Sequence, residues 1–308
     1  MRSNIGMDQA EGLRRILVRN QTQVISVVAG KSGVGRTSAT INLATALASI
    51  GKDVLVLDEN HGPDNLLDRL GLYTKYDLLD IAQGKCTPKE AVLITNGFSV
   101  LNTARAMSKF SMLDQIGQQR LEDALTKVSG GVDVMLVDTM MPVLNKTKEQ
   151  ARQTTVSSSM ASGAALLVVV DATASGITES YALIKRLALE NERSRFEMLV
   201  NKVGEEQVAL RVFENMAKVA RRNLAARLEY LGYIPSDNKL RHAAQLGKPV
   251  VEVFPNAVSA KLYMEAAQKL LCLPIQQDEE KCGIPNVIQK LIKQLARKNS
   301  RAIAYVAN

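Results

Sequence analysis

A glycine-rich turn near the start of the chain constrains its fold more than any other feature. An apolar, β-branched run at residues 24–29 leads into this turn, and a stretch with helical character follows at residues 39–49. A strand, a glycine-rich loop and a helix in this order form the frame of a phosphate-binding loop, because glycines let backbone N–H groups close around phosphate oxygens at the positive end of the helix. The candidate phosphate-binding residues are Gly30, Lys31, Ser32, Gly33, Val34, Gly35, Arg36, Thr37 and Ser38.

Two later apolar runs each end in an aspartate. The run Val-Leu-Val-Leu ends at Asp58, and the run Val-Met-Leu-Val ends at Asp138. One such run is weak evidence, since strand ends often carry a solvated aspartate, but two in order after a glycine-rich loop form a specific pattern. Aspartates at these places hold Mg²⁺ directly or through water, and a hydroxyl of the loop completes the set. We therefore expect Thr37, Asp58 and Asp138 to hold the metal.

The alternation of strand-like and helical segments predicts a doubly wound α/β domain. Strands are expected at residues 24–29, 54–58, 98–102, 133–138, 164–171, 196–201 and 228–234, and amphipathic helices at 112–128, 177–189, 205–224 and 259–271. Because the strands are nearly continuous apolar runs, we expect a mostly parallel sheet that is covered on both faces and carries ligand groups at the carboxyl ends of its strands. We place this domain at residues 24–272, between an N-terminal segment at 1–23 and a linker with a C-terminal helix at 273–308.

Composition narrows the classes of partner and compartment. No apolar run reaches the roughly 18 residues of a membrane span, and the polar N-terminus lacks the apolar core of a signal peptide. The three cysteines are widely spaced and form no CxxC pair, which favours the cytoplasm and disfavours a carrier of metal clusters. A net charge of +8 favours an anionic partner, whereas 4% aromatic residues and no Trp count against base-stacking platforms, so DNA is not the expected partner.

The glycine-rich loop resembles the deviant Walker A loop, KGGVGKT, of the MinD/ParA superfamily of P-loop ATPases. Lys31 matches the signature lysine, which in that superfamily reaches the nucleotide of the partner subunit in an ATP-bound dimer. The resemblance then narrows to the FlhG (or FleN) family of flagellar number regulators. Residues 7–15, 177–185 and 248–255 are similar to its DQAxxLR segment, its SITDAYALIK helix and a block specific to the family. The match extends over about residues 7–272.

The resemblance implies a regulator of flagellar number and placement that binds ATP or ADP with Mg²⁺ and cycles between a monomer and an ATP-dependent homodimer. It also implies partners: the signal-recognition-type GTPase FlhF, whose GTP hydrolysis the N-terminal segment stimulates, and flagellar switch (C-ring) or transcription-regulator proteins. The residues that match the FlhF-binding motif are Asp8, Gln9, Ala10, Leu13 and Arg14, with Gln9 as the active element.

The C-terminal residues predict an amphipathic helix. Val287, Ile288, Leu291, Ile292 and Leu295 recur at helical spacing, and Lys and Arg residues fill the other side. This pattern suits a helix that lies on an anionic membrane surface, and a helix packed on the chain's own body remains the alternative. Membrane attachment would place this cytoplasmic protein peripherally at the inner membrane, near the cell pole.

Three positions depart from the superfamily pattern at the chemically critical places. Arg36 replaces the lysine that bridges β- and γ-phosphates, Ser32 replaces a glycine, and Asn60 replaces the second aspartate of the DxD motif. Arginine is a planar fork and not a conservative substitute for lysine, and asparagine has no carboxylate to act on water. We expect nucleotide binding with very slow or no turnover, so Lys31, Asp58 and Asn60 are catalytic candidates in a weak ATPase at best.

Some alternatives stay open at the level of sequence. Asn201 ends a strand where an amide could pair with an adenine edge, and a turn-forming role fits this residue equally well. A ParA-like DNA partition ATPase is the first rival function, supported by the positive charge. A hydrolysis-deficient adaptor, gated by nucleotide or free of it, is the second, because of Arg36 and Asn60.

Overall fold

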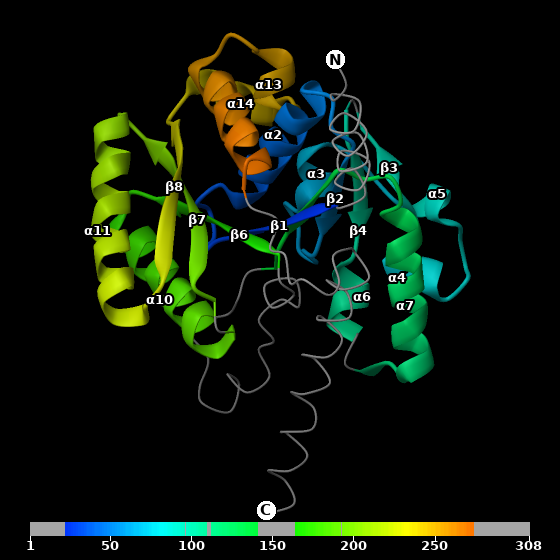
Figure 1. The fold of residues 1–308 in the computed structure, drawn as a ribbon. Coiled ribbons are helices and arrows are strands. Elements are labelled where there is room, and N and C mark those ends of the chain that lie inside the picture. Colours follow the sequence, from blue (N-terminus) through cyan, green and yellow to red (C-terminus); the bar gives the residue numbers. More distant parts are fainter. Residues whose placement is uncertain (1–21, 96, 110–111, 141–163, 192, 274–308) are drawn as a thin grey trace, which may run out of the picture.

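The structure, a computed structural model, describes residues 22–95, 97–109, 112–140, 164–191 and 193–273 (Figure 1). These residues form a single eight-stranded sheet with helices against both faces. The strands are β1 Gln23–Val28, β2 Val54–Asp58, β3 Leu93–Ile94, β4 Ser99–Asn102, β5 Val134–Asp138, β6 Ala165–Asp171, β7 Arg195–Val203 and β8 Arg227–Pro235. Their order across the sheet is β3-β4-β2-β5-β1-β6-β7-β8, and only the pair β3–β4 is antiparallel.

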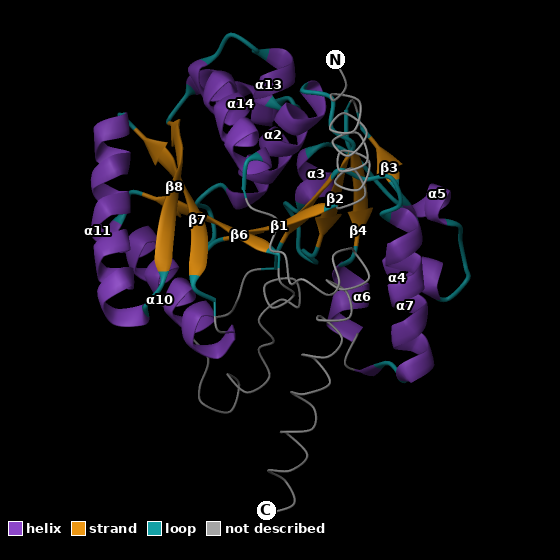
Figure 2. Cartoon of the chain, viewed as in Figure 1, coloured by secondary structure: helices purple, strands orange, loops and turns teal. Residues whose placement is uncertain are grey.

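The helices form two layers, one on each face of the sheet (Figure 2). They are α2 Arg36–Ser49, α3 Leu66–Arg69, α4 Leu78–Ala82, α5 Pro88–Ala91, α6 Ala104–Lys109, α7 Gln115–Val128, α10 Ala174–Asn191, α11 Glu206–Leu224, α12 Asn238–Gln245, α13 Val250–Val253 and α14 Val258–Leu271. No helix in these described ranges is long and apolar enough to cross a membrane.

The central strand β1 shows why its sequence is apolar throughout. Successive side chains of a strand point to opposite faces, and both faces are covered here. Val27 belongs to the core beneath α2 and α14, while Val28 belongs to the core beneath α10 and α11. Both side chains are fully buried. A third apolar cluster lies beneath α4 and α7 at the other end of the sheet.

Strand register places the predicted polar residues together at the carboxyl ends of the parallel strands. Asp58 at the end of β2 lies beside Asp138 at the end of β5, and Asp138 also lies beside Val27 of β1. Asn201 of β7 lies beside Asp171 of β6 on the other side of β1. Because all these strands are parallel, their carboxyl ends face the loop that follows β1, which is the usual place for a ligand in an open α/β sheet.

The predicted fold class is confirmed, with differences in the short elements. Strand β3 and the helices α3 to α6, α12 and α13 were not predicted from the sequence, since most of them have too few residues to show a period. The helix expected from residue 112 begins instead at Gln115, since the Asp114 carboxylate accepts the Gly117 N–H at 2.8 Å and caps it. The segment boundaries at 23 and 273 stay predictions.

Candidate functional site

The loop between β1 and α2 adopts a backbone shape that glycine alone takes without strain. Gly33 and Gly35 have φ angles of +78° and +94°, in the left-handed region. Gly35 also precedes the first turn of α2 and accepts the Ala39 N–H at 2.9 Å. The unpaired N–H groups of this first turn, together with those of the loop, form a concave anion-binding surface.

Two glycines of the loop lie where a side chain would collide with a neighbouring element. A Cβ on Gly30 would sit 2.3 Å from the backbone of Glu179 and Ser180 in α10. A Cβ on Gly35 would sit 2.3 Å from the Asn201 side-chain nitrogen. The loop is therefore held closely by α10 on one side and by the end of β7 on the other.

Asn201 and Lys202 tie the end of β7 to the loop. The Asn201 Nδ2 donates to the Val34 carbonyl at 2.8 Å, and its Oδ1 accepts the Lys202 N–H at 2.9 Å. The Lys202 ammonium donates to the Gly33 carbonyl at 2.6 Å. Both amide atoms of Asn201 are thus engaged within the protein, and each keeps one further donor or acceptor site, so its contact with adenine stays a prediction.

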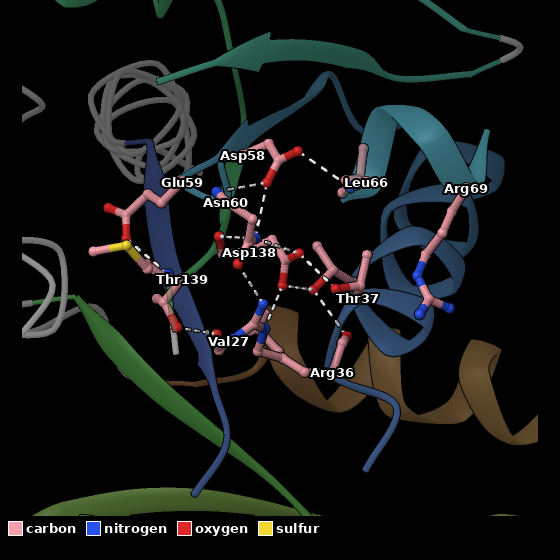
Figure 3. A network of polar contacts seen from close by, with 12 residues as sticks. Val27, Arg36, Thr37, Asp58, Glu59, Asn60, Leu66, Arg69, Asp138 and Thr139 are labelled. Carbon is pink, nitrogen blue, oxygen red and sulfur yellow. Dashed lines mark hydrogen bonds and ion pairs between the residues drawn. The ribbon is translucent and has the colours of Figure 1, made fainter. Parts of the chain in front are cut away.

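The Arg36 side chain joins Asp138 at the end of β5 to Asn60, which follows β2 (Figure 3). Its Nε donates to Asp138 Oδ1 at 2.7 Å, and its Nη2 donates to Asn60 Oδ1 at 2.7 Å. The Arg36 side chain is 9% exposed and the Asp138 side chain is fully buried, so this is an ion pair within the protein. The departure from lysine at position 36 therefore connects directly with the departure from aspartate at position 60.

Asn60 links the two aspartates. Its Nδ2 donates to Asp58 Oδ1 at 2.8 Å and to Asp138 Oδ2 at 3.0 Å, and its backbone N–H also reaches Asp58 Oδ1. An aspartate at this position would instead put a third carboxylate against two others. The amide donates to both carboxylates while its oxygen accepts from Arg36, so the network needs asparagine here.

Thr37 and Asp138 fit a phosphate-bound Mg²⁺, with the Thr37 hydroxyl as the direct ligand and Asp138 as the residue that orients this hydroxyl. The Thr37 hydroxyl donates to Asp138 Oδ2 at 2.8 Å, which leaves the lone pairs of that hydroxyl for a cation. Within the described ranges no three His, Cys, Asp or Glu side chains form a metal-holding group, so a metal would have to arrive with phosphate oxygens. Mg²⁺ in nucleotide sites commonly uses one or two protein ligands in this way.

Asp58 is a titratable group of the site whose environment disfavours its charged form. Burial, and then the nearby charge of Asp138, raise the pKa of Asp58 to about 6, against opposing hydrogen bonds from Asn60 and Leu66. The Leu66 N–H, at the start of α3, donates to Asp58 Oδ2 at 3.2 Å. The carboxylate therefore anchors the loop that leads from β2 into α3.

A cavity of about 530 Å³ opens above the loop, within the usual size of a small-molecule site. Besides residues 31–38, its lining consists of Arg69, Asn201, Lys202, Pro235, Ser236, Asp237, Leu240, Arg241 and Ala244. The residues that follow β8 and those of α12 were not among the candidates predicted from the sequence. The signal that could have found them was the rule that ligands bind at strand carboxyl ends, applied to the strand at residues 228–234.

The remaining candidates are placed differently. Lys31 lines the cavity, and its ammonium donates to the Ser175 hydroxyl of α10 at 2.7 Å. Ser32 and Ser38 line the same cavity. The candidates Asp8, Gln9, Ala10, Leu13 and Arg14, and the C-terminal amphipathic helix, lie outside the described residues.

Replacing Gly35 with alanine should abolish nucleotide binding, because the new Cβ would displace the Asn201 amide that fixes the loop. Gly84→Ala is the matched control: Gly84 also has a positive φ, +72°, but nothing lies within 4 Å of the position that the new methyl group would take. Both variants should lose about 1–2 kcal/mol of stability from left-handed strain. Calorimetric titration with ATP separates them, and ordinary binding by Gly35→Ala would contradict the loop geometry.

Asp58 should make the nucleotide-free protein more stable as the pH falls. Its folded pKa of about 6 lies above the ordinary 3.8, so the folded state binds the proton more tightly between these values. The unfolding free energy of the wild type minus that of Asp58→Asn should fall by on the order of 3 kcal/mol from about pH 4 to about pH 7. Urea unfolding at each pH measures this difference, and the variant Asp123→Asn, at an exposed position, is the control. A difference that does not change with pH would contradict the raised pKa of Asp58.

Comparisons with known proteins agree with this geometry. The family of the CobQ/CobB/MinD/ParA nucleotide binding domain matches residues 25–250. The antiactivator FleN of Pseudomonas aeruginosa is 34% identical over 254 residues, which cover 82% of this chain and 88% of FleN. The flagellum site-determining protein YlxH of Helicobacter pylori is 24% identical, over 90% of this chain and 92% of YlxH.

Solved structures give the same fold. A chain of the MinC:MinD cell division protein complex of Aquifex aeolicus has a TM-score of 0.61 and 26% identity, over 85% of this chain and 100% of that one. MinD of Pyrococcus horikoshii, complexed with Mg-ADP, has a TM-score of 0.58 and 20% identity, over 81% of this chain and 96% of that one. The family model covers most of the chain and FleN is 34% identical to it, so the chain belongs to the CobQ/CobB/MinD/ParA family of nucleotide-binding domains.

Proposed function

We propose that this chain is an ATP-binding regulator of flagellar number and placement. The observation that carries the proposal is the similarity to the antiactivator FleN, at 34% identity over 82% of the chain. A second relative, YlxH, is also named for the flagellum, whereas the MinD relatives are named for the septum site. Since one fold hosts many functions, the flagellar assignment rests on these two relatives and not on the fold.

ATP or ADP with Mg²⁺ is the proposed ligand of the cavity. The loop N–H groups and Arg36 would hold the phosphates, the Thr37 hydroxyl would ligate the metal, and Asp58 and Asp138 would order the shell around it. The bound metal supplies neutralisation of phosphate charge. The lining residues at the end of β8 and in α12 would contact the nucleoside, and the cavity volume of about 530 Å³ supports a ligand of this size.

Hydrolysis at this site is proposed to be slow. The catalytic candidates are Lys31, Asp58 and Asn60, and the third has no carboxylate to orient water by charge. Its amide is also engaged with both aspartates and with Arg36. A long-lived nucleotide-bound state would suit a protein whose output is set by the state it occupies rather than by turnover.

Lys31 is the proposed link between nucleotide and dimer. Its side chain lines the cavity and is held by one exposed hydrogen bond to Ser175. Exchange of that single contact for a phosphate oxygen of a partner subunit would cost little, because one exposed hydrogen bond contributes about 1 kcal/mol. ATP would thereby favour a homodimer and ADP a monomer.

The two ends of the chain are proposed to carry the interactions. The segment with Gln9 would bind FlhF and stimulate its GTP hydrolysis, and the C-terminal helix would hold the protein at the anionic inner membrane, near the cell pole. Two copies of that helix on one dimer would bind through effective concentration where one copy is marginal. Flagellar switch (C-ring) or transcription-regulator proteins are further proposed partners.

A ParA-like DNA partition ATPase remains the second candidate, favoured by the net charge of +8. The two functions differ in a simple property. Binding through phosphate neutralisation weakens steeply with salt, so DNA binding that falls by orders of magnitude between low and physiological salt would favour partition. Absence of DNA binding at low salt would exclude it.

Deleting the gene should increase the number of flagella per cell, since the relative FleN is an antiactivator. The wild-type chain and Gly84→Ala should restore the number when supplied in trans, while Gly35→Ala should not, because only the latter disturbs the phosphate loop. Electron microscopy of whole cells gives the counts. An unchanged number in the deletion strain would contradict the proposed function.

The full-length chain should raise GTP hydrolysis by FlhF, and Gln9→Ala should remove most of that stimulation while retaining binding. A glutamine amide can orient an attacking water without changing its protonation, as in other GTPase sites. Gln21→Ala is the matched control in the same segment and should stimulate like the wild type. If Gln9→Ala stimulates GTP hydrolysis by FlhF as fully as the wild type does, the segment only binds FlhF and the catalytic role of Gln9 is wrong.

A further inference from the structure

The Asp138 carboxylate has little capacity left for a metal. Its Oδ1 accepts from Arg36 Nε at 2.7 Å and from the Thr40 hydroxyl at 3.4 Å. Its Oδ2 accepts from the Thr37 hydroxyl at 2.8 Å and from Asn60 Nδ2 at 3.0 Å. A carboxylate offers about four lone-pair sites, and three have a committed donor here, because the single Thr40 hydroxyl hydrogen also has the Arg36 carbonyl closer, at 3.1 Å. A metal, or a water bound to a metal, would have to use the one remaining site or displace one of these donors.

Asp58 is engaged to the same degree. Its Oδ1 accepts twice from Asn60, through the backbone N–H and the side-chain amide, and its Oδ2 accepts from the Leu66 N–H. Without rearrangement the site therefore offers a divalent cation the Thr37 hydroxyl and one remaining lone-pair site on each buried aspartate. That is a thin ligand set on which to base nucleotide affinity, because Mg²⁺ sheds its waters reluctantly.

The positive charge that phosphates require is already supplied by side chains. The cavity lining carries five cationic residues, Lys31, Arg36, Arg69, Lys202 and Arg241, and a single acid, Asp237. Arg36 is the buried member of this group, and its Nη1 has no hydrogen-bond partner. Nη1 therefore retains two N–H donors in a region of low dielectric, where a charge interacts more strongly than in water.

We propose that this site binds nucleoside phosphates without depending on a divalent cation, with Arg36 Nη1 as the fixed phosphate donor and the other cationic residues of the lining as the counter-charge. The inference rests on the nucleotide binding proposed above. Asn60 is the positioning residue: it accepts from Arg36 and donates to both aspartates, which keeps the guanidinium between strand ends and loop. Mg²⁺ bound through Thr37 and the phosphates would then add little to affinity.

Arg36 and Asn60 form a matched pair in this arrangement. With lysine at position 36, one nitrogen would have to replace the separate Nε and Nη2 contacts to Asp138 and Asn60. With aspartate at position 60, a third negative charge would face Asp58 and Asp138, and a divalent cation would be needed to neutralise it. The double variant Arg36→Lys with Asn60→Asp should therefore convert the site to metal-dependent binding.

The test is calorimetric titration of the full-length chain with ATP and with ADP, in excess Mg²⁺ and in excess EDTA. The wild-type Kd should differ by less than about 3-fold between the two buffers, and the Kd of the double variant should rise by at least about 10-fold in EDTA. The control Arg120→Lys with Asn223→Asp makes the same chemical changes at exposed sites of α7 and α11 and should behave as wild type.

The outcomes are distinguishable. A wild-type Kd that rises 10-fold or more in EDTA overturns this inference and leaves nucleotide binding standing. No binding in either buffer overturns both. A double variant with no greater metal dependence than the wild type overturns the assignment to Arg36 and Asn60. Should the double variant fail to fold, the thermal shift of the wild type by ATP in each buffer decides, with equal shifts supporting the inference.

Discussion

Two opposite charges, the Arg36 guanidinium and the Asp138 carboxylate, meet below the surface at the carboxyl edge of the sheet. Removing both from water costs several kcal/mol per ion, and their attraction offsets that cost only when the remaining donors and acceptors are also satisfied. The hydroxyl of Thr37 and the amide of Asn60 provide that satisfaction for the carboxylate. Loss of one partner from such a buried pair costs about 3–5 kcal/mol, so loop, strand end and α2 are held as one unit.

This dependence changes the meaning of the two departures from the superfamily pattern. Taken from the sequence, Arg36 and Asn60 are two separate losses, of a phosphate-bridging lysine and of a carboxylate. In three dimensions they are bonded to each other at 2.7 Å, and the asparagine serves as donor to both aspartates. A site with both changes is therefore one connected hydrogen-bond network, rather than two unrelated losses.

Sequence alone predicts what depends on local pattern. The apolar runs identify seven strands, and their common direction brings Asp58, Asp138 and the loop to one edge. Short elements such as β3 and α3 are not predictable in this way, because two to four residues cannot show a period. Contacts between segments far apart in the chain are also missing from the pattern.

Asn201 illustrates this limit. A strand-ending asparagine is compatible with a turn and with a base contact, and only its distance from Val34 shows that it supports the loop. The cavity wall after β8 was missed for the same reason, since Pro235 to Asp237 carry no motif and acquire a role through their position at a strand end. The N-terminal segment with Gln9 is the opposite case: its assignment depends on motif resemblance alone.

A crystal structure of the chain with ATP and no divalent cation tests the central claim most directly. The account predicts a phosphate oxygen within about 3.2 Å of Arg36 Nη1, a hydrogen-bonding distance, while Nε remains on Asp138 and Nη2 on Asn60. Phosphates that leave the guanidinium without contact would contradict it, as would an Arg36 side chain that has left Asp138 and Asn60.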